Sequence, residues 1–296
     1  MPSPFRTSLP AVAALALLLP PTVHLSAGAD QAADVVAHAR AALGGDGALS
    51  KVQALRVTGA VRRVAGEREI DGTLEVDLQR PDKYLQVETM NPMGDLTMTT
   101  KTGFNGDRLI TSSEQHGGAP GMVFRMGGRP EDAAGQARMV RGLHGDFNRD
   151  LVAWLIELPA GGDSRFTYVG RAESPDGSQA DAIDATGPDG FTVRLYLDAK
   201  SGRPLMASWR GPSRQIRVMT QRGPRPEGGR TMPPPPPNGA PPEADIQLFF
   251  SDYHRVDGLQ FPFHISRSEN GNTIEEWTIK KVEVNPTFPA DLFAAK

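Results

Sequence analysis

The sequence contains no cysteine. This absence excludes disulfides, thiol catalysis, iron–sulfur clusters and cysteine-based zinc sites. A basic excess is also missing, because 32 Lys and Arg residues stand against 35 Asp and Glu residues, so we expect no nucleic acid as a partner. Glycine (32) and proline (26) are instead abundant in the 296 residues, which argues against a long helical bundle and indicates many turns, a linker, or both.

The motifs of common catalytic sites are missing as well. No histidine pair falls in H-E-x-x-H, no serine in G-x-S-x-G, and no Walker A lysine or G-x-G-x-x-G follows a predicted strand. We therefore predict no metal, no cofactor and no enzymatic activity. Two carboxylates that meet across a cleft as general acid and base are the alternative that the sequence leaves open.

Residues 1–29 have the pattern of a secretory signal peptide. Arg6 precedes an apolar run at 11–19 that is too short to span a bilayer, and Ala27-Gly28-Ala29 forms a small-residue cleavage site. A frayed helix or a short membrane anchor is the alternative. No cysteine follows that could carry a lipid anchor, so we expect residues 30–296 to form a single soluble domain in the periplasm.

The mature chain is predicted to be an α+β protein with a large, strongly curved antiparallel sheet. Helical spacing of apolar residues occurs at 30–43 and 148–158. From residue 56 onward apolar residues alternate with polar ones, which predicts ten or eleven strands in meander order, separated by turns such as Asp257-Gly258 and Asn270-Gly271. The segment 221–245 holds nine prolines, and we expect a disordered insertion there, with a ligand for proline-recognition domains as the alternative.

The apolar side of the predicted strands should line the concave face of this sheet. The candidates for a ligand cavity are Leu74, Val76, Leu78, Leu85, Val87, Val193, Leu195, Leu197, Trp209, Phe261, Phe263, Trp277 and Ile279. Two helices are little cover for ten strands, so we predict a partly vacant apolar cavity for a lipid or acyl chain. The alternative is a concavity that helices and loops fill completely.

Four further residues are candidates for a lid over this cavity. Trp154 lies on the apolar face of the second predicted helix, and Met122, Met126 and Met139 belong to a methionine-rich, irregular stretch. Flexible thioethers suit surfaces that repack around variable ligands, but they also fill gaps in ordinary cores.

Several short phrases occur in an order that is similar to a known family. They are AALGG at 41–45, GTLEVDLQRPDKY at 72–84, FNGDRL at 104–109, DYHRVDGLQFP at 252–262, VNP at 284–286 and DLF at 291–293. In this order they resemble the periplasmic outer-membrane lipoprotein carriers, the LolA/LolB-like superfamily.

The resemblance implies an unclosed β-barrel covered by a few helices, with acyl chains held in its hollow. The family's carrier takes lipoproteins from a membrane-bound donor to an acceptor that is itself a lipoprotein. Without an anchoring cysteine, this chain is more similar to the soluble carrier, and Arg62 and Arg63 are candidates by position for the carrier's lid-locking arginine. We therefore expect a non-enzymatic periplasmic carrier or binder of lipoproteins or other acylated ligands, with an envelope-sensing regulatory protein of the same fold as the alternative.

Overall fold

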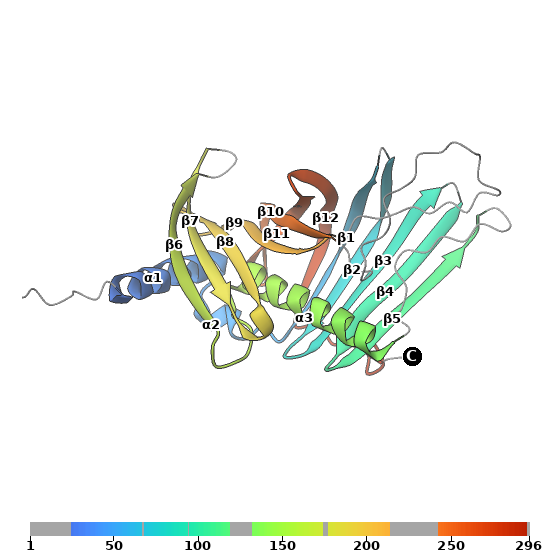
Figure 1. The fold of residues 1–296 in the computed structure, drawn as a ribbon, viewed down its shortest axis with the longest axis horizontal. Coiled ribbons are helices and arrows are strands. Elements are labelled where there is room, and N and C mark those ends of the chain that lie inside the picture. The colour runs from blue at the N-terminus through green and yellow to red at the C-terminus, as the bar shows by residue number, and fades with distance from the viewer. Residues whose placement is uncertain are drawn as a thin grey trace, which may run out of the picture.

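The computed structural model describes residues 25–66, 68–93, 95–118, 132–173, 177–213 and 242–294. The lid candidates Met122 and Met126 and most of the predicted proline-rich insertion lie outside these ranges. The elements (Figure 1) are α1 (Leu25–Leu43), α2 (Asp46–Leu49), β1 (Ala54–Ala65), β2 (Arg68–Gln79), β3 (Lys83–Met93), β4 (Leu96–Asn105), β5 (Arg108–His116), α3 (Ala133–Leu155), β6 (Arg165–Glu173), β7 (Gln179–Thr186), η1 (Pro188–Gly190), β8 (Thr192–Asp198), β9 (Pro204–Pro212), β10 (Glu243–Val256), β11 (Leu259–Glu269) and β12 (Asn272–Val284).

The strands form one antiparallel sheet with the order β5-β4-β3-β2-β1-β12-β11-β10-β9-β8-β7-β6. It consists of two meanders that the β1–β12 pairing joins. Gly59 lies at this junction, where a Cβ atom would be 2.4 Å from the carbonyl oxygen of Thr278, so only glycine allows the two strands to approach so closely. The end strands β5 and β6 are not neighbours in the sheet, which is therefore unclosed, and the predicted α+β fold class is confirmed.

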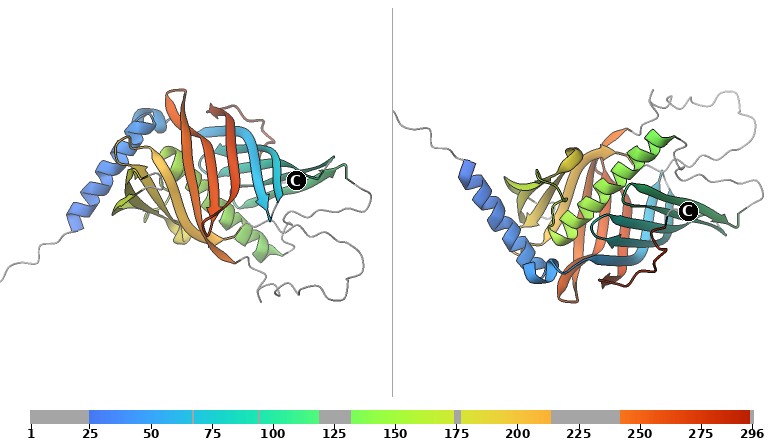
Figure 2. Two further views of the ribbon diagram at one scale, coloured as in Figure 1. Left: turned by 90° about the horizontal axis from the view of Figure 1, so that it is seen from above. Right: turned by 90° about the horizontal axis from the view of Figure 1, so that it is seen from below.

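The long helix α3 crosses the concave side of the sheet (Figure 2). It begins at Ala133, after the N-cap Asp132, whose carboxylate accepts a hydrogen bond from the amide of Gly135. The helix predicted at 148–158 was therefore too short at its start and too long at its end. Gly142 and Gly145 lower helix propensity and interrupt the apolar pattern in the first half of α3, which hides the helical spacing of this part in the sequence.

Two other predicted boundaries also move. Helix α1 begins at Leu25, not at residue 30, so the predicted cleavage site after Ala29 falls inside a helix that packs against β6 and β11. Strand β10 begins at Glu243, which lies inside the predicted insertion at 221–245. Across the described ranges, no helix has both the length and the apolar character to cross a membrane.

The core has two parts, one on each face of the sheet. The larger cluster lies on the concave face under α3, and a small one on the opposite face contains Leu85, Ile110 and Phe293, with Val87, Phe288 and Leu292 beside it. The prediction that Leu85 and Val87 lie on the concave face was wrong. They pair with Asp77 and Glu75, so they share the convex face, where the C-terminal segment covers them. Alternation tells which residues share a face of one strand, but not which face is concave.

Candidate functional site

The concave face carries a continuous apolar surface beneath α3. Of the predicted cavity residues, those that are buried in its cluster are Leu74, Val76, Leu78, Val193, Leu195, Leu197, Trp209, Phe261 and Ile279, and those partly buried against it are Phe263 and Trp277. The lid candidate Trp154 is buried in the same cluster, and Met139 packs against it from α3. The structure thus brings eleven of the thirteen cavity candidates together on one face.

This surface is largely filled by α3 itself. The pocket between α3 and the sheet has a volume of about 30 Å³, which is room for about two or three water molecules. Its lining comprises Tyr84, Gln86, Asp146, Arg149, Asp150, Trp154, Trp209, Leu248, Phe250, Ile265, Arg267, Glu275 and Trp277. An acyl chain does not fit into this volume, so a ligand on this face requires α3 to move.

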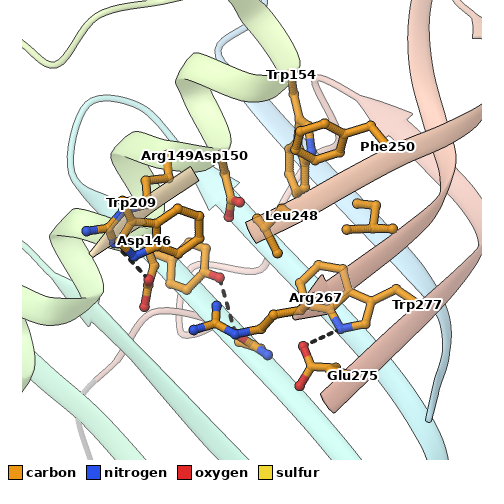
Figure 3. A pocket seen from close by; sticks show the side chains of 13 residues that line it. Asp146, Arg149, Asp150, Trp154, Trp209, Leu248, Phe250, Arg267, Glu275 and Trp277 are labelled. Carbon is orange, nitrogen blue, oxygen red and sulfur yellow. Dashed lines mark hydrogen bonds and ion pairs between the residues drawn. The ribbon is translucent and has the colours of Figure 1, made fainter. Parts of the chain in front are cut away.

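One end of the pocket is polar (Figure 3). Two guanidinium groups lie over the ring of Trp209, that of Arg149 at 4.5 Å and that of Arg267 at 5.5 Å from the ring centroid. Arg149 also contacts Asp146 at 3.1 Å on the same helix, and the Trp277 indole donates to Glu275 at 2.7 Å. Charged side chains from α3 and from the sheet therefore meet in one partly buried layer.

The prediction overlooked these polar residues, although a signal for two of them exists. Arg267 lies two residues after Ile265, and Glu275 two residues before Trp277, so both share the inward side of their strands with apolar neighbours. An ionisable residue on the inward side of a strand is uncommon and indicates a candidate functional site.

Arg62 and Arg63, the two lid-lock candidates, lie on opposite faces of β1. The Arg63 side chain, 15% exposed, contacts Glu88 of β3 and Glu275 of β12, each at 2.6 Å. Arg62 is half exposed on the convex face beside Asp71. The described ion pairs of Arg63 thus join strands of the sheet and do not involve α3.

The C-terminal end of α3 is anchored by a guanidinium group. Arg40 of α1 donates to the carbonyl oxygens of Leu155 at 3.1 Å and Ile156 at 2.9 Å, which a helix end leaves without intrahelical donors. Arg80 forms an ion pair with Glu157 just beyond. Ile156 has φ 49°, a strained conformation for a β-branched residue, which these hydrogen bonds and this ion pair hold in place.

The middle of α3 contacts the sheet through an aromatic cluster. The His144 ring stacks on Phe104 with 3.9 Å between ring centroids, and its Nε2 lies 3.2 Å from the carbonyl oxygen of Gly106. Phe147 packs edge-on against both Phe104 and Tyr84. These contacts hold α3 against β3 and β4 in the closed arrangement.

Several titratable groups away from this pocket have clear pKa shifts. Burial raises the pKa of the Tyr253 phenol, and the hydrogen bond to Asp184 raises the pKa of Arg194. On the convex face, burial raises the pKa of Glu75. Within the described part of the chain, no group of three or more His, Asp or Glu side chains could hold a metal ion.

These features define an open, strongly curved antiparallel sheet whose apolar concave face is crossed by α3, with α1 packed against β6 and β11. No protein-family model matches the chain, and no curated protein matches it. Among solved structures, the chain is similar to a LolA superfamily protein from Nitrosomonas europaea, with 12% identity, a TM-score of 0.47 and coverage of 89% of this chain and 97% of that one.

Two other solved structures are similar to the chain. A DUF1329 family protein from Desulfovibrio piger has 9% identity and a TM-score of 0.45, over 88% of this chain and 96% of that one. A domain assigned to outer membrane lipoprotein sorting, from Vibrio parahaemolyticus, has 9% identity and a TM-score of 0.44, over 90% and 97%.

Proposed function

We propose that the protein binds an acylated ligand, a lipid or a lipid-modified protein, on the concave face beneath α3 and carries it through the periplasm. The observation that carries this proposal is the continuous apolar face of the sheet, which the long helix α3 crosses. Each methylene that leaves water for such a surface contributes about 0.8 kcal/mol to the free energy of binding. Binding of an acyl chain therefore requires no catalytic group in the protein.

The same arithmetic supports displacement of α3 by a ligand. A chain of about sixteen carbons gains about 12 kcal/mol on full burial, which is comparable to the whole stability of a typical domain. Because Arg40 holds the C-terminal end of α3, we expect the other end to move away from β4 and β5. Release would require membrane-bound donor and acceptor partners that bind the ligand with different affinities.

The absence of native cysteine permits a direct test by cross-linking. His144→Cys on α3 and Asp107→Cys beside Gly106 on the β4–β5 turn place two thiols on either side of the helix–sheet contact. A short bismaleimide that joins them should abolish binding of a fluorescent fatty-acid probe, because α3 can then no longer leave the sheet. The same variant without the cross-linker should still bind the probe.

A matched control is available on the convex face. Arg62→Cys and Asp71→Cys are direct cross-strand partners on β1 and β2, so a cross-link there leaves α3 free and should leave probe binding intact. If the locked α3 variant binds as tightly as the control, the ligand site is not beneath α3. Lipid mass spectrometry of the protein purified from its native envelope provides the second test, since a carrier should retain acyl species.

A further inference from the structure

The pocket under α3 has two chemically different ends. In Figure 3, Trp154 and Phe250 gather at one end, while Arg267 and Glu275 lie at the other. An acyl chain would contact only the apolar end of the pocket. We propose that the polar end binds a zwitterionic headgroup, in which an ammonium is joined to a phosphate or carboxylate. This inference rests on the proposed function and adds the ligand class to it.

The polar end offers both signs of charge within one lining. Arg149 and Arg267 present guanidinium groups that can pair with an anion, and both are already positioned against the ring of Trp209. Asp146 on α3 and Glu275 on β12 present carboxylates at this end that can pair with an ammonium, and Asp150 of α3 adds a third carboxylate to the pocket lining. Both α3 and the sheet contribute positively and negatively charged side chains. A headgroup that enters between α3 and the sheet therefore contacts charges of both signs.

Existing ion pairs determine which headgroup can enter. Arg149 contacts Asp146 at 3.1 Å, and Glu275 contacts Arg63 at 2.6 Å. A headgroup with one charge would take one partner of such a pair and leave the other without its counter-charge in a partly buried site, which is unfavourable. A zwitterion inserted into the pair replaces one ion pair with two and introduces no net charge.

The geometry also suggests why the ligand must be an amphiphile. The pocket volume of about 30 Å³ holds no headgroup until the helix is displaced. The apolar chain drives that displacement under the proposed function, and the headgroup then pairs with the side chains that the movement exposes. A headgroup without a chain lacks this driving force.

The test compares four probes with the same dodecyl chain below their micellar concentrations, by calorimetry on the full chain. They are dodecylphosphocholine, dodecyl sulfate, dodecyltrimethylammonium and the neutral octaethylene glycol dodecyl ether. We expect the phosphocholine to bind roughly tenfold more tightly than either singly charged probe, the factor that about 1.4 kcal/mol represents. Phosphocholine without a chain should bind at least 100-fold more weakly than dodecylphosphocholine.

The outcomes separate the two proposals. If all four dodecyl probes fail to bind, the proposed function falls and this inference falls with it. If the sulfate, the trimethylammonium or the neutral probe binds as tightly as the phosphocholine, only the headgroup site is refuted. If phosphocholine without a chain binds as tightly as dodecylphosphocholine, the site binds small molecules. That result would refute the claim that the ligand must be an amphiphile.

A variant tests the role of the carboxylates. Asp150→Asn removes one carboxylate from the lining, so the preference for phosphocholine over sulfate should fall about tenfold, because the ammonium loses a partner. Asp71→Asn removes a carboxylate from the convex face and should leave this ratio unchanged. Thermal unfolding of both variants checks the fold. An unchanged ratio in a folded Asp150→Asn variant would overturn the assignment.

Discussion

Replacing Arg63 with methionine should strongly destabilise the protein. The Arg63 guanidinium lies between two carboxylates that are almost completely buried, with Glu88 8% and Glu275 7% exposed. Removal of one partner from a buried ion pair costs about 3–5 kcal/mol, because an uncompensated charge stays behind. Here two carboxylates would remain and would also repel each other.

Neighbouring donors reduce the expected loss. Glu88 keeps a hydrogen bond from the Gln86 amide, and Glu275 keeps the one from the Trp277 indole. We therefore expect a loss near the lower limit, about 3 kcal/mol, which corresponds to a decrease of about 1 M or more in the urea midpoint for typical m-values. Urea unfolding followed by tryptophan fluorescence measures this midpoint.

The adjacent residue supplies the control. Arg62→Met removes a half-exposed guanidinium that contacts Asp71 at 3.1 Å on the convex face, and the midpoint should hardly change. The triple variant Arg63→Met/Glu88→Gln/Glu275→Gln should recover much of the loss, because it also removes the charges left behind. A decrease below about 0.3 M for Arg63→Met, or no recovery in the triple variant, would refute the argument.

Three further predictions concern pH and packing. Burial raises the pKa of Glu75, so the folded state holds this proton more tightly than the unfolded state, and stability should fall as the pH rises through the interval between the two pKa values. Glu75→Gln should weaken that fall in urea titrations at several pH values. Burial likewise raises the pKa of Tyr253, so stability should decrease above about pH 10, where the unfolded phenol ionises, and less so in Tyr253→Phe. Gly59→Ala should cost about 2 kcal/mol of unfolding free energy because its Cβ would clash with backbone, whereas Gly47→Ala, with nothing within 4 Å, should be neutral or slightly stabilising.

The hairpins were predictable because their signals are local. Asn270 and Gly271 both have positive φ, as do Asp257 and Gly258, and these dipeptides adopt such angles readily. Strand alternation likewise identified most of the concave face. It misplaced Leu85 and Val87 because the convex face has an apolar patch of its own under the C-terminal segment.

The first half of α3 and the polar pocket could not be predicted in the same way. The glycines in α3 lower its local propensity, and tertiary contacts with β4, β5, β9 and α1, which local periodicity does not reveal, stabilise the helix. The polar pocket depends on the order of the strands. Arg63, Glu88 and Glu275 meet only because β1 lies between β2 and β12, which places β3 and β12 within reach of one side chain.

The charges beneath α3 have a consequence for how the helix and the sheet can separate. Well-packed apolar residues are often at least as stabilising as a buried ion pair, so stability alone does not explain charged groups such as Arg149, Arg267 and Glu275 in this layer. A purely apolar contact would expose only apolar surface to water when α3 moves away. When α3 moves away from a layer that includes charges, the charged groups regain their hydration. This gain offsets part of the free energy lost by exposing apolar surface to water. The same side chains that weaken the closed contact are those that a polar headgroup can reach, so opening of α3 and recognition of the ligand depend on one set of residues.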